Sequence, residues 1–305
     1  MPTSRRKFLG QTAFTVAALS SSLNGITLEA LDALPCAEPS QGPTLAETVP
    51  VRFADVGPIK LAYLDVPGTG TPIVALHGLF SRGATFSPLA KALAGRHRLI
   101  AVDQRGHGQS DKPEDYSRAA FVEDIATLIG KVGLGPVILL GHSLGGLNSY
   151  QLAAKHPELV KALIIEDIGT TISADFSFMA NWPTRFQTHR DLHDFLEQKF
   201  NSAFYFMESA TEYPDGWGLR FDYRHMIAAG KAASGDWWQD FAASKCPALL
   251  IHGHKSFALN TAHARDICRR RANTKLLEFS TSGHTIHDDD PAGFNNAVIE
   301  FLKTV

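Results

Sequence analysis

A serine and a histidine stand out in this chain because their surroundings suit nucleophilic chemistry. Ser143 lies at the centre of Gly141-His142-Ser143-Leu144-Gly145, which has the pattern G-x-S-x-G. A serine hydroxyl is a weak nucleophile until a base removes its proton, and a histidine with an ordinary pKa of about 6.5 suits that task. His284, in Ser282-Gly283-His284 near the C-terminus, is the candidate base. The pair predicts attack of a serine oxygen on a carbonyl carbon.

A histidine base also requires a carboxylate that orients its ring and stabilises the imidazolium. Glu166 and Asp167 are candidates because they lie at the end of an apolar run, residues 160–166. Neighbouring side chains on a strand point in opposite directions, so only one of the two can face the histidine. Asp103 is a third candidate, although its neighbours Arg105-Gly106 look like a structural turn. The residues alone leave this choice open.

The segments around Ser143 predict a strand, a tight turn and a helix. Residues 137–140 are apolar and flanked by glycines, which is typical of a short buried strand. Leucines at roughly helical spacing follow, and they predict a helix that stops near His156, ahead of Pro157. Ser143 then occupies a strained strand-to-helix turn, where glycine neighbours allow close approach of the backbone.

Short apolar runs alternate with segments of helical character along the rest of the chain. Residues 51–66 alternate loosely and predict two antiparallel edge strands, with Gly57-Pro58 as the turn. Such alternation indicates an α/β fold with a mostly parallel sheet covered by helices on both faces. Further strands are predicted at residues 72–76, 98–102, 160–166, 248–252 and 275–279, and a helix is predicted at residues 118–131.

Residues 170–243 interrupt this alternation. They contain all four tryptophans and many phenylalanines, no evident strand, and weakly helical stretches such as residues 191–200. We expect a helical cap over the carboxyl edge of the sheet, where open α/β sheets bind ligands. Most of its aromatic residues would fill the cap's own core, and a few would face a ligand. The α/β core is then expected at residues 45–169 and 244–305.

The first forty residues differ in kind from the rest. Arg5-Arg6 precede a mildly apolar run at residues 13–19, the pattern of a twin-arginine export signal followed by a linker. A disordered basic tail is the alternative. The run is too short for a membrane span, which needs about 20 residues. The expected partner is the export machinery, and the expected location is periplasmic or secreted. We expect Cys246 and Cys268 to be free thiols rather than a disulfide.

Length and charge limit the remaining function classes. The chain has 305 residues, 44% of them hydrophobic, which suffices for one large domain with a sizeable core. The formal net charge of −2 provides no basic stripe for phosphates, which argues against a nucleic-acid partner. His252, His254 and His263 lack metal-ligand spacing, so no metal site is predicted. His287, beside three aspartates, is expected in a solvated loop before a helix N-terminus.

Four motifs occur in an order that resembles the α/β-hydrolase superfamily. They are the G-x-S-x-G motif, His77-Gly78 with its loop, the stretch Asp103-Gln104-Arg105-Gly106-His107-Gly108-Gln109-Ser110, and Ser282-Gly283-His284. The resemblance runs from about residue 51 to the C-terminus apart from the cap, and the family's chain order is nucleophile, acid, histidine. It implies the α/β-hydrolase fold, with Ser143 as nucleophile and His284 as base.

The resemblance also bears on the acid and on the oxyanion donors. In most of the family an aspartate follows the strand after the cap, but here that place reads Gly253-His254-Lys255-Ser256-Phe257, without a carboxylate. Some members carry the acid after the strand before the cap, and their pattern selects Asp167. The implied oxyanion donors are the backbone amides of Leu144, just after the nucleophile, and Leu79. His77 is expected to orient the Leu79 loop.

The resemblance implies a serine hydrolase that cleaves a small or medium apolar carboxylic ester through an acyl-enzyme, without a metal or organic cofactor. The arginine pair at the N-terminus adds the expectation that this enzyme is exported. A lactonase or a carbon–carbon bond hydrolase with the same triad remains open. A serine nucleophile argues against the epoxide hydrolases and haloalkane dehalogenases of this fold, whose nucleophile is a carboxylate. A non-catalytic ligand-binding protein is the alternative from another class, favoured only by the missing aspartate.

Overall fold

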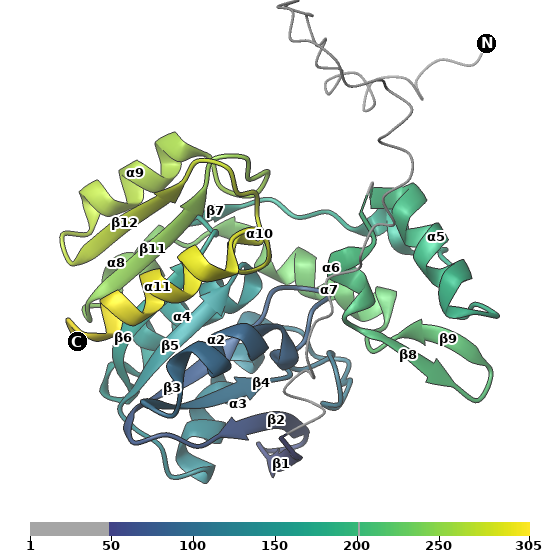
Figure 1. Ribbon diagram of the computed structural model, residues 1–305, viewed down its shortest axis with the longest axis horizontal. Coiled ribbons are helices and arrows are strands. Elements are labelled where there is room, and N and C mark those ends of the chain that lie inside the picture. Colours follow the sequence, from purple (N-terminus) through teal and green to yellow (C-terminus); the bar gives the residue numbers. More distant parts are fainter. Residues whose placement is uncertain (1–48, 201) are drawn as a thin grey trace, which may run out of the picture. The chain divides into compact units, whose positions relative to one another are not determined.

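Eight strands form the central sheet of the computed structural model, which describes residues 49–200 and 202–305 (Figure 1). The predicted export signal, at residues 1–40, lies outside these residues. The strand order is β1-β2-β4-β3-β5-β6-β11-β12. Neighbouring strands are antiparallel in the pairs β1–β2 and β2–β4 and parallel in all other pairs. The strands are β1 (Val51–Asp55), β2 (Lys60–Val66), β3 (Gly70–Leu76), β4 (His97–Val102), β5 (Val137–His142), β6 (Val160–Glu166), β11 (Ala248–Gly253) and β12 (Thr274–Phe279).

The predicted mostly parallel α/β sheet is confirmed. β6 has the predicted bounds, and the other buried strands begin or end within two residues of the prediction. One detail is wrong: β1 and β2 were both expected at the edge, but only β1 lies there. The reason is that β2 pairs with β4 on its other side, through contacts such as Leu64 with Ala101.

The parallel strands end at the same edge of the sheet. Leu76 at the end of β3 pairs with Gly141 in β5, and His142 at the end of β5 pairs with Glu166 in β6. Glu166 in turn pairs with Ile251 in β11. The residues that directly follow β3, β5, β6 and β11 therefore emerge close together at the carboxyl edge, where open α/β sheets place their ligand sites.

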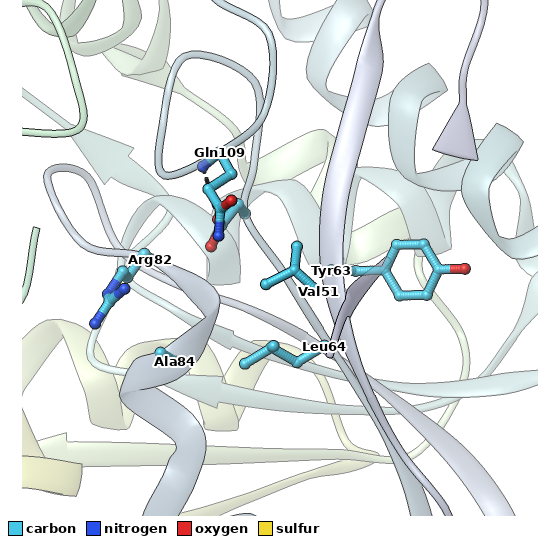
Figure 2. Close-up of a pocket in the computed structure, with 7 residues that line it drawn as sticks. Val51, Tyr63, Leu64, Arg82, Ala84 and Gln109 are labelled. Carbon is cyan, nitrogen blue, oxygen red and sulfur yellow. Dashed lines mark hydrogen bonds between the residues drawn. The ribbon is translucent and has the colours of Figure 1, made fainter. Parts of the chain in front are cut away.

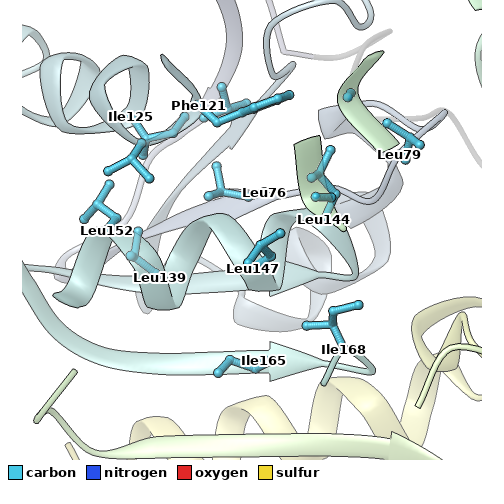
Figure 3. Close-up of a cluster of buried hydrophobic side chains, with 14 of the residues drawn as sticks. Leu76, Leu79, Phe121, Ile125, Leu139, Leu144, Leu147, Leu152, Ile165 and Ile168 are labelled. Atoms are coloured by element: carbon cyan, nitrogen blue, oxygen red, sulfur yellow. The ribbon is translucent and has the colours of Figure 1, made fainter. Parts of the chain in front are cut away.

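Helices cover both faces of this sheet. On one face, α2 and α11 pack against strand residues such as Ile138 and Ile164. On the other face, α3, α4 and α9 belong to one buried cluster with residues such as Leu139 and Ile165. Figure 3 shows the part of this cluster that α3 and α4 form with the strands. Alternate residues serve opposite faces because side chains alternate along a strand. Replacing a fully buried leucine such as Leu139 by alanine typically costs about 2–5 kcal/mol. The helices are α2 (Ser87–Leu93), α3 (Arg118–Lys131), α4 (Leu144–Lys155), α9 (Thr261–Arg270) and α11 (Pro291–Leu302).

Residues 170–243 contain helices and also short strands, which corrects the expectation of an interval without strands. Their β8–β9 hairpin turns at Pro214-Asp215-Gly216, a common turn sequence, and Gly216 has a φ of 126° that favours glycine. β7 and β10 form a second antiparallel pair. The elements described here are β7 (Thr171–Ile172), α5 (His189–Phe200), α6 (Phe204–Met207), β8 (Ala210–Tyr213), β9 (Gly216–Leu219), α7 (Tyr223–Ala233), β10 (Gly235–Asp236) and α8 (Trp238–Ala243).

The described residues also bear on the thiols and on membrane spans. Cys246 and Cys268 are free thiols, as predicted, and both are half-buried. Burial raises the pKa of each thiol, that of Cys268 to about 11. Within the part of the chain that the structure describes, no helix combines the length and the apolar character needed to cross a bilayer.

Candidate active site

Ser143 occupies the turn between β5 and α4, with φ 49° and ψ −115°. A positive φ is strained for a residue other than glycine, and such strain gathers at functional sites. The flanking glycines make the turn possible. A Cβ on Gly141 would lie 2.3 Å from the carbonyl carbon of Gly145, and one on Gly145 would lie 2.0 Å from the carbonyl oxygen of Leu76. The local sequence thus presents the serine at the carboxyl edge, at the N-terminus of α4.

His284 and Asp167 are hydrogen-bonded, although 117 positions separate them in the sequence. Nδ1 of His284 donates to Oδ2 of Asp167 over 2.8 Å. Asp167 is fully buried and also has a positive φ, 51°. This bond leaves Nε2 of His284 free to accept a proton. Ser143 and His284 line one cavity. Among the described residues no hydrogen bond joins these two side chains, and in ligand-free sites such bonds are often long.

Asp167 accepts three hydrogen bonds besides the one from the histidine. Nδ1 of His252 and the amide of Gly253 donate to Oδ1 over 3.0 and 3.1 Å. The hydroxyl of Ser256 donates to Oδ2. Four donors therefore hold the carboxylate in one orientation. Sequence reasoning missed His252 and Ser256 as its partners. A signal existed for Ser256, since it stands in the segment after the cap where most of the family carries the acid and this chain has no carboxylate.

Leu79 and Leu144, whose backbone amides are the expected oxyanion donors, both line the cavity that Ser143 lines. No hydrogen bond found among residues 49–200 and 202–305 uses either amide as donor. The neighbouring amide of Phe80 is different, because it donates to Nε2 of His107 over 3.2 Å. The hydroxyl of Tyr205 donates to the carbonyl oxygen of Leu79 over 2.8 Å and so holds the peptide between Leu79 and Phe80.

His77 supports the loop that carries Leu79 and does not line the cavity. Its Nδ1 donates to the carbonyl oxygen of Gly78 over 2.7 Å, and its Nε2 accepts from the amide of Gln104 over 3.0 Å. Burial lowers the pKa of His77 to about 4, so the ring is neutral at pH 7. These contacts agree with the expected orienting role.

Asp103, the alternative acid, belongs to a structural turn. Its Oδ1 accepts from the amide of Gly83 over 2.8 Å, and its Oδ2 accepts from the amide of Gln109 over 2.9 Å. The hollow beside it measures about 10 Å³, no more than one water molecule (Figure 2). In the described part of the chain, Asp103 makes no hydrogen bond to His284.

A second buried polar cluster lies next to these residues. Oε1 of Glu166 accepts from the backbone amide of His287 over 2.8 Å, and Nδ1 of His287 lies 2.9 and 2.8 Å from the two carboxylate oxygens. Nε2 of His142 donates to the carbonyl oxygen of His284 over 2.9 Å. The expectation that His287 lies in a solvated loop is wrong, since it is only 5% exposed. One ligand atom each of His142, Glu166 and His287 lies within 4.8 Å of the others, as in a metal site, but Glu166 and His287 already bond each other.

The cavity that Ser143 and His284 line has a volume of about 710 Å³. Its walls are mostly apolar, and the described residues that line it include three charged side chains, namely Asp175, Lys255 and Asp289. None of the four tryptophans is among the described lining residues. Trp182, for example, packs edge-on against Phe195, with ring centres 5.2 Å apart. The aromatic lining residues are Phe80, Phe176, Phe200, Tyr205, Phe206 and Phe257.

Comparison with known proteins agrees with this geometry. The sequence model of the alpha/beta hydrolase fold family matches residues 71–291. A 2-(acetamidomethylene)succinate hydrolase of Mesorhizobium japonicum is 43% identical over 264 residues, which cover 82% of this chain and 94% of that protein. The sn-1-specific diacylglycerol lipase ABHD11 of Mus musculus is 30% identical over 272 residues, with 82% and 87% covered.

A solved structure gives the same result in three dimensions. The crystal structure of an E-2-(acetamidomethylene)succinate hydrolase superposes with a TM-score of 0.75 at 27% identity. The superposition covers 84% of this chain and 99% of that one. With the eight-stranded sheet and the serine turn already described, these matches show that the chain belongs to the α/β-hydrolase family.

Proposed function

We propose that this chain is a serine hydrolase that cleaves carboxylic esters with neutral, apolar acyl groups through a Ser143, His284 and Asp167 triad. One observation carries the proposal. His284, which donates to the buried Asp167 over 2.8 Å, lines the same cavity as Ser143 on its strained turn. A histidine with that partner, close to a serine on such a turn, has the arrangement of a serine nucleophile and its base.

In the proposed reaction, Nε2 of His284 takes the hydroxyl proton while Oγ of Ser143 attacks the ester carbonyl carbon. The carbonyl electron pair moves onto oxygen, where the amides of Leu79 and Leu144 bind it, and one such donor contributes roughly 3 kcal/mol. The carbon–oxygen bond to the alcohol then breaks, and the imidazolium returns its proton to the leaving oxygen. Water attacks the acyl-enzyme with the same base and releases the acid. Asp167 keeps the ring tautomer correct throughout.

The cavity supports a neutral, apolar acyl group. Each methylene that leaves water for an apolar wall contributes about 0.8 kcal/mol, so this lining favours acyl chains longer than acetyl. Its charges oppose an anionic acyl group. Asp175 and Asp289 contribute two carboxylates, and Lys255 is the one cation among the described lining residues. A carboxylate on the substrate would therefore meet more repulsion than attraction.

One relative supports a second candidate. The 43% identity to a 2-(acetamidomethylene)succinate hydrolase suggests cleavage of an acylated enamine that carries carboxylates. The same triad suits an amide carbonyl, and Lys255, a cation of the cavity lining, would pair with one carboxylate. A succinate has two carboxylates, which favour several cationic donors. The single cation of the described lining is why the ester is our first choice.

The test is a fluorophosphonate probe followed by a substrate panel. The probe should label the wild-type protein but not Ser143→Ala, which separates a serine hydrolase from a non-catalytic binding protein. The panel contains p-nitrophenyl esters of rising chain length, lactones, a carbon–carbon bond hydrolase substrate and 2-(acetamidomethylene)succinate. We expect the largest kcat/KM for a medium-chain ester. A larger value for the succinate would make the second candidate correct, and an unlabelled wild type would overturn both.

We also propose that the enzyme is exported to the periplasm or beyond. The proposal rests on Arg5-Arg6 and the mildly apolar run that follows them.

A further inference from the structure

The buried cluster beside the triad consists of close sequence neighbours of the triad residues. Glu166 and His142 each directly precede a triad member, and His287 lies three residues after another, in α10 (Ile286–Asp289). The catalytic scheme above uses none of these three side chains. All three are nevertheless fully or almost fully buried. Buried ionisable groups are costly unless they are paired, so their burial at this place requires a reason.

We propose that Glu166, His287 and His142 are positioning residues that clamp the loop of His284 so that its Nε2 faces Ser143. This inference rests on the proposed function, because it assigns a role relative to that base and nucleophile. The clamp consists of three hydrogen-bonded contacts. Two of them, called anchors here, join the His284 loop to strands of the sheet. The third joins the loop to the segment that follows the Leu79 loop.

The two anchors hold loop residues that are three positions apart, His284 and His287. At its start, Nε2 of His142 donates to the backbone carbonyl oxygen of His284 over 2.9 Å, which ties the loop to β5. At its end, the carboxylate of Glu166 accepts from both the amide and Nδ1 of His287, which ties the loop to β6. Since β5 and β6 are paired neighbours, both anchors belong to one rigid frame. The backbone around His284 is thus held at two points, while Asp167 holds the ring of His284 through Nδ1.

The third contact reaches the segment that follows the oxyanion loop. Nε2 of His287 lies 3.1 Å from Oγ1 of Thr85, in the short 3-10 helix η2 (Gly83–Phe86). An imidazolium donates from both ring nitrogens, so charged His287 serves Glu166 and Thr85 at the same time. The cluster thereby joins the histidine loop to the chain just beyond Leu79. A displacement near 1 Å in such a frame can cost about 10²-fold in rate.

The charges around His287 favour its protonated form. Burial by itself lowers the pKa of His287, but Glu166 on β6 and Asp288 on its own helix raise it to about 9, and Glu208 after α6 adds to this. His142, which faces His287 from β5, has a pKa well below the usual value because it is buried and lies near His284. The folded pKa of His287 exceeds the ordinary value of about 6.5. Its stabilising effect is therefore complete below pH 6.5 and is lost as the pH rises through 9.

The experiment measures the rate of fluorophosphonate labelling of Ser143 from pH 6 to pH 10. The test variant is Glu166→Gln with His287→Gln, which removes both members of the hydrogen-bonded pair. The control is Glu123→Gln, which removes the carboxylate charge from a partly exposed pair, Glu123 with His156 at 3.1 Å, on the helical surface. Thermal unfolding and circular dichroism verify that each variant is folded across the pH range.

We expect the double variant to label about 10²-fold more slowly at pH 7.5. With p-nitrophenyl butyrate its kcat should fall while KM changes less than threefold. The labelling rates of wild type and of the control should fall above pH 9. The labelling rate of the double variant should not fall there, because this variant has lost His287, the group that titrates near that pH. His142→Leu, which removes the donor to the His284 carbonyl oxygen, should slow labelling as well.

Two different failures can be told apart. If the probe does not label the wild type, the proposed function is contradicted, and the clamp proposal that rests on it is contradicted as well. A wild type that is labelled, and a folded double variant that matches it in rate and in pH profile, overturns the clamp alone. A slow double variant that keeps the fall above pH 9 also overturns it, because the loss then has no link to the charge on His287.

Discussion

Asp167 reaches the ring of His284 from the end of β6 and not from the loop after β11. The loop after β11 supplies Ser256 instead, whose hydroxyl donates to the same carboxylate oxygen. The two positions are close because β6 and β11 are paired neighbours in the sheet. An acid on either strand is therefore within reach of a histidine on the same edge, and in this chain a hydroxyl supports an acid that comes from the adjacent strand.

Replacing the acid by its amide should separate its role from that of its neighbours. Asp167→Asn should fold, because the amide has the size of the carboxylate, but it should lose roughly 10³–10⁴-fold in kcat, since the wrong histidine tautomer is favoured. Glu166→Gln, which leaves the hydrogen bond between Asp167 and His284 in place, should lose much less. Steady-state kinetics with a p-nitrophenyl ester measure both. A large loss in Asp103→Asn, with normal turnover in Asp167→Asn, would assign the acid to Asp103.

The neighbouring position should accept the acid when Asp167 is disabled. In the Asp167→Asn background, Ser256→Asp places a carboxylate on the side chain that already contacts residue 167. We expect the kcat of this double variant to be at least tenfold higher than that of Asp167→Asn alone, because a carboxylate at position 256 can again accept from Nδ1 of His284. The matched control is Ser256→Ala in the same background, which should recover nothing. Equal rates for the two substitutions would contradict the geometric argument.

Aromatic residues at the cavity wall should set chain-length preference. Phe176→Ala and Phe206→Ala remove apolar wall and should shift the preferred ester by one or more methylene pairs, with little effect on a short acetate. Trp238→Ala is the control, since Trp238 lies beneath Arg270, 4.2 Å from ring centre to guanidinium carbon, and not among the lining residues. Profiles of kcat/KM against chain length decide the matter. Unchanged profiles for both phenylalanine variants would mean that these side chains pack against other residues and do not contact the acyl chain.

The sequence predicts the frame of this molecule well because its signals are local. α3 begins and ends where we expected, and Ser117 caps its first turn by accepting the amide of Ala120. The buried strands follow from continuous apolar runs between glycines and prolines. β7 and β10 have two residues each, which is too few for any periodicity to appear.

The parts of the site that sequence analysis did not predict depend on partners that are distant in the sequence. The burial of His287 follows from Glu166, 121 positions away, whereas the adjacent aspartates suggest solvent. The bond from His252 to Asp167 likewise depends on strand order, which the sequence of either strand does not contain. Residue types and motif order therefore indicated Ser143 and His284, and the resemblance to the α/β-hydrolases added Asp167. The groups that hold them in place required the three-dimensional structure.

The N-terminal arginines give a prediction that is independent of the site. Changing Arg5 and Arg6 together to lysine should leave unprocessed precursor in the cytoplasm, because the twin-arginine receptor reads that pair. Cell fractionation and immunoblotting of wild type and variant measure this, with Lys7→Arg as a charge-matched control. Equal amounts of both proteins in the periplasm would show that the segment is not such a signal.

The central claim, that Ser143 is the nucleophile activated by His284, is tested most directly by trapping the acyl-enzyme. Wild-type protein mixed with p-nitrophenyl butyrate and quenched within one turnover should carry a butyryl group on the peptide that contains Ser143, as measured by mass spectrometry. Ser143→Ala and His284→Ala should each lose several orders of magnitude in kcat, and the double variant should be barely worse, because the two residues act as one unit. An adduct on another residue, or near-normal turnover by folded Ser143→Ala, would contradict the account.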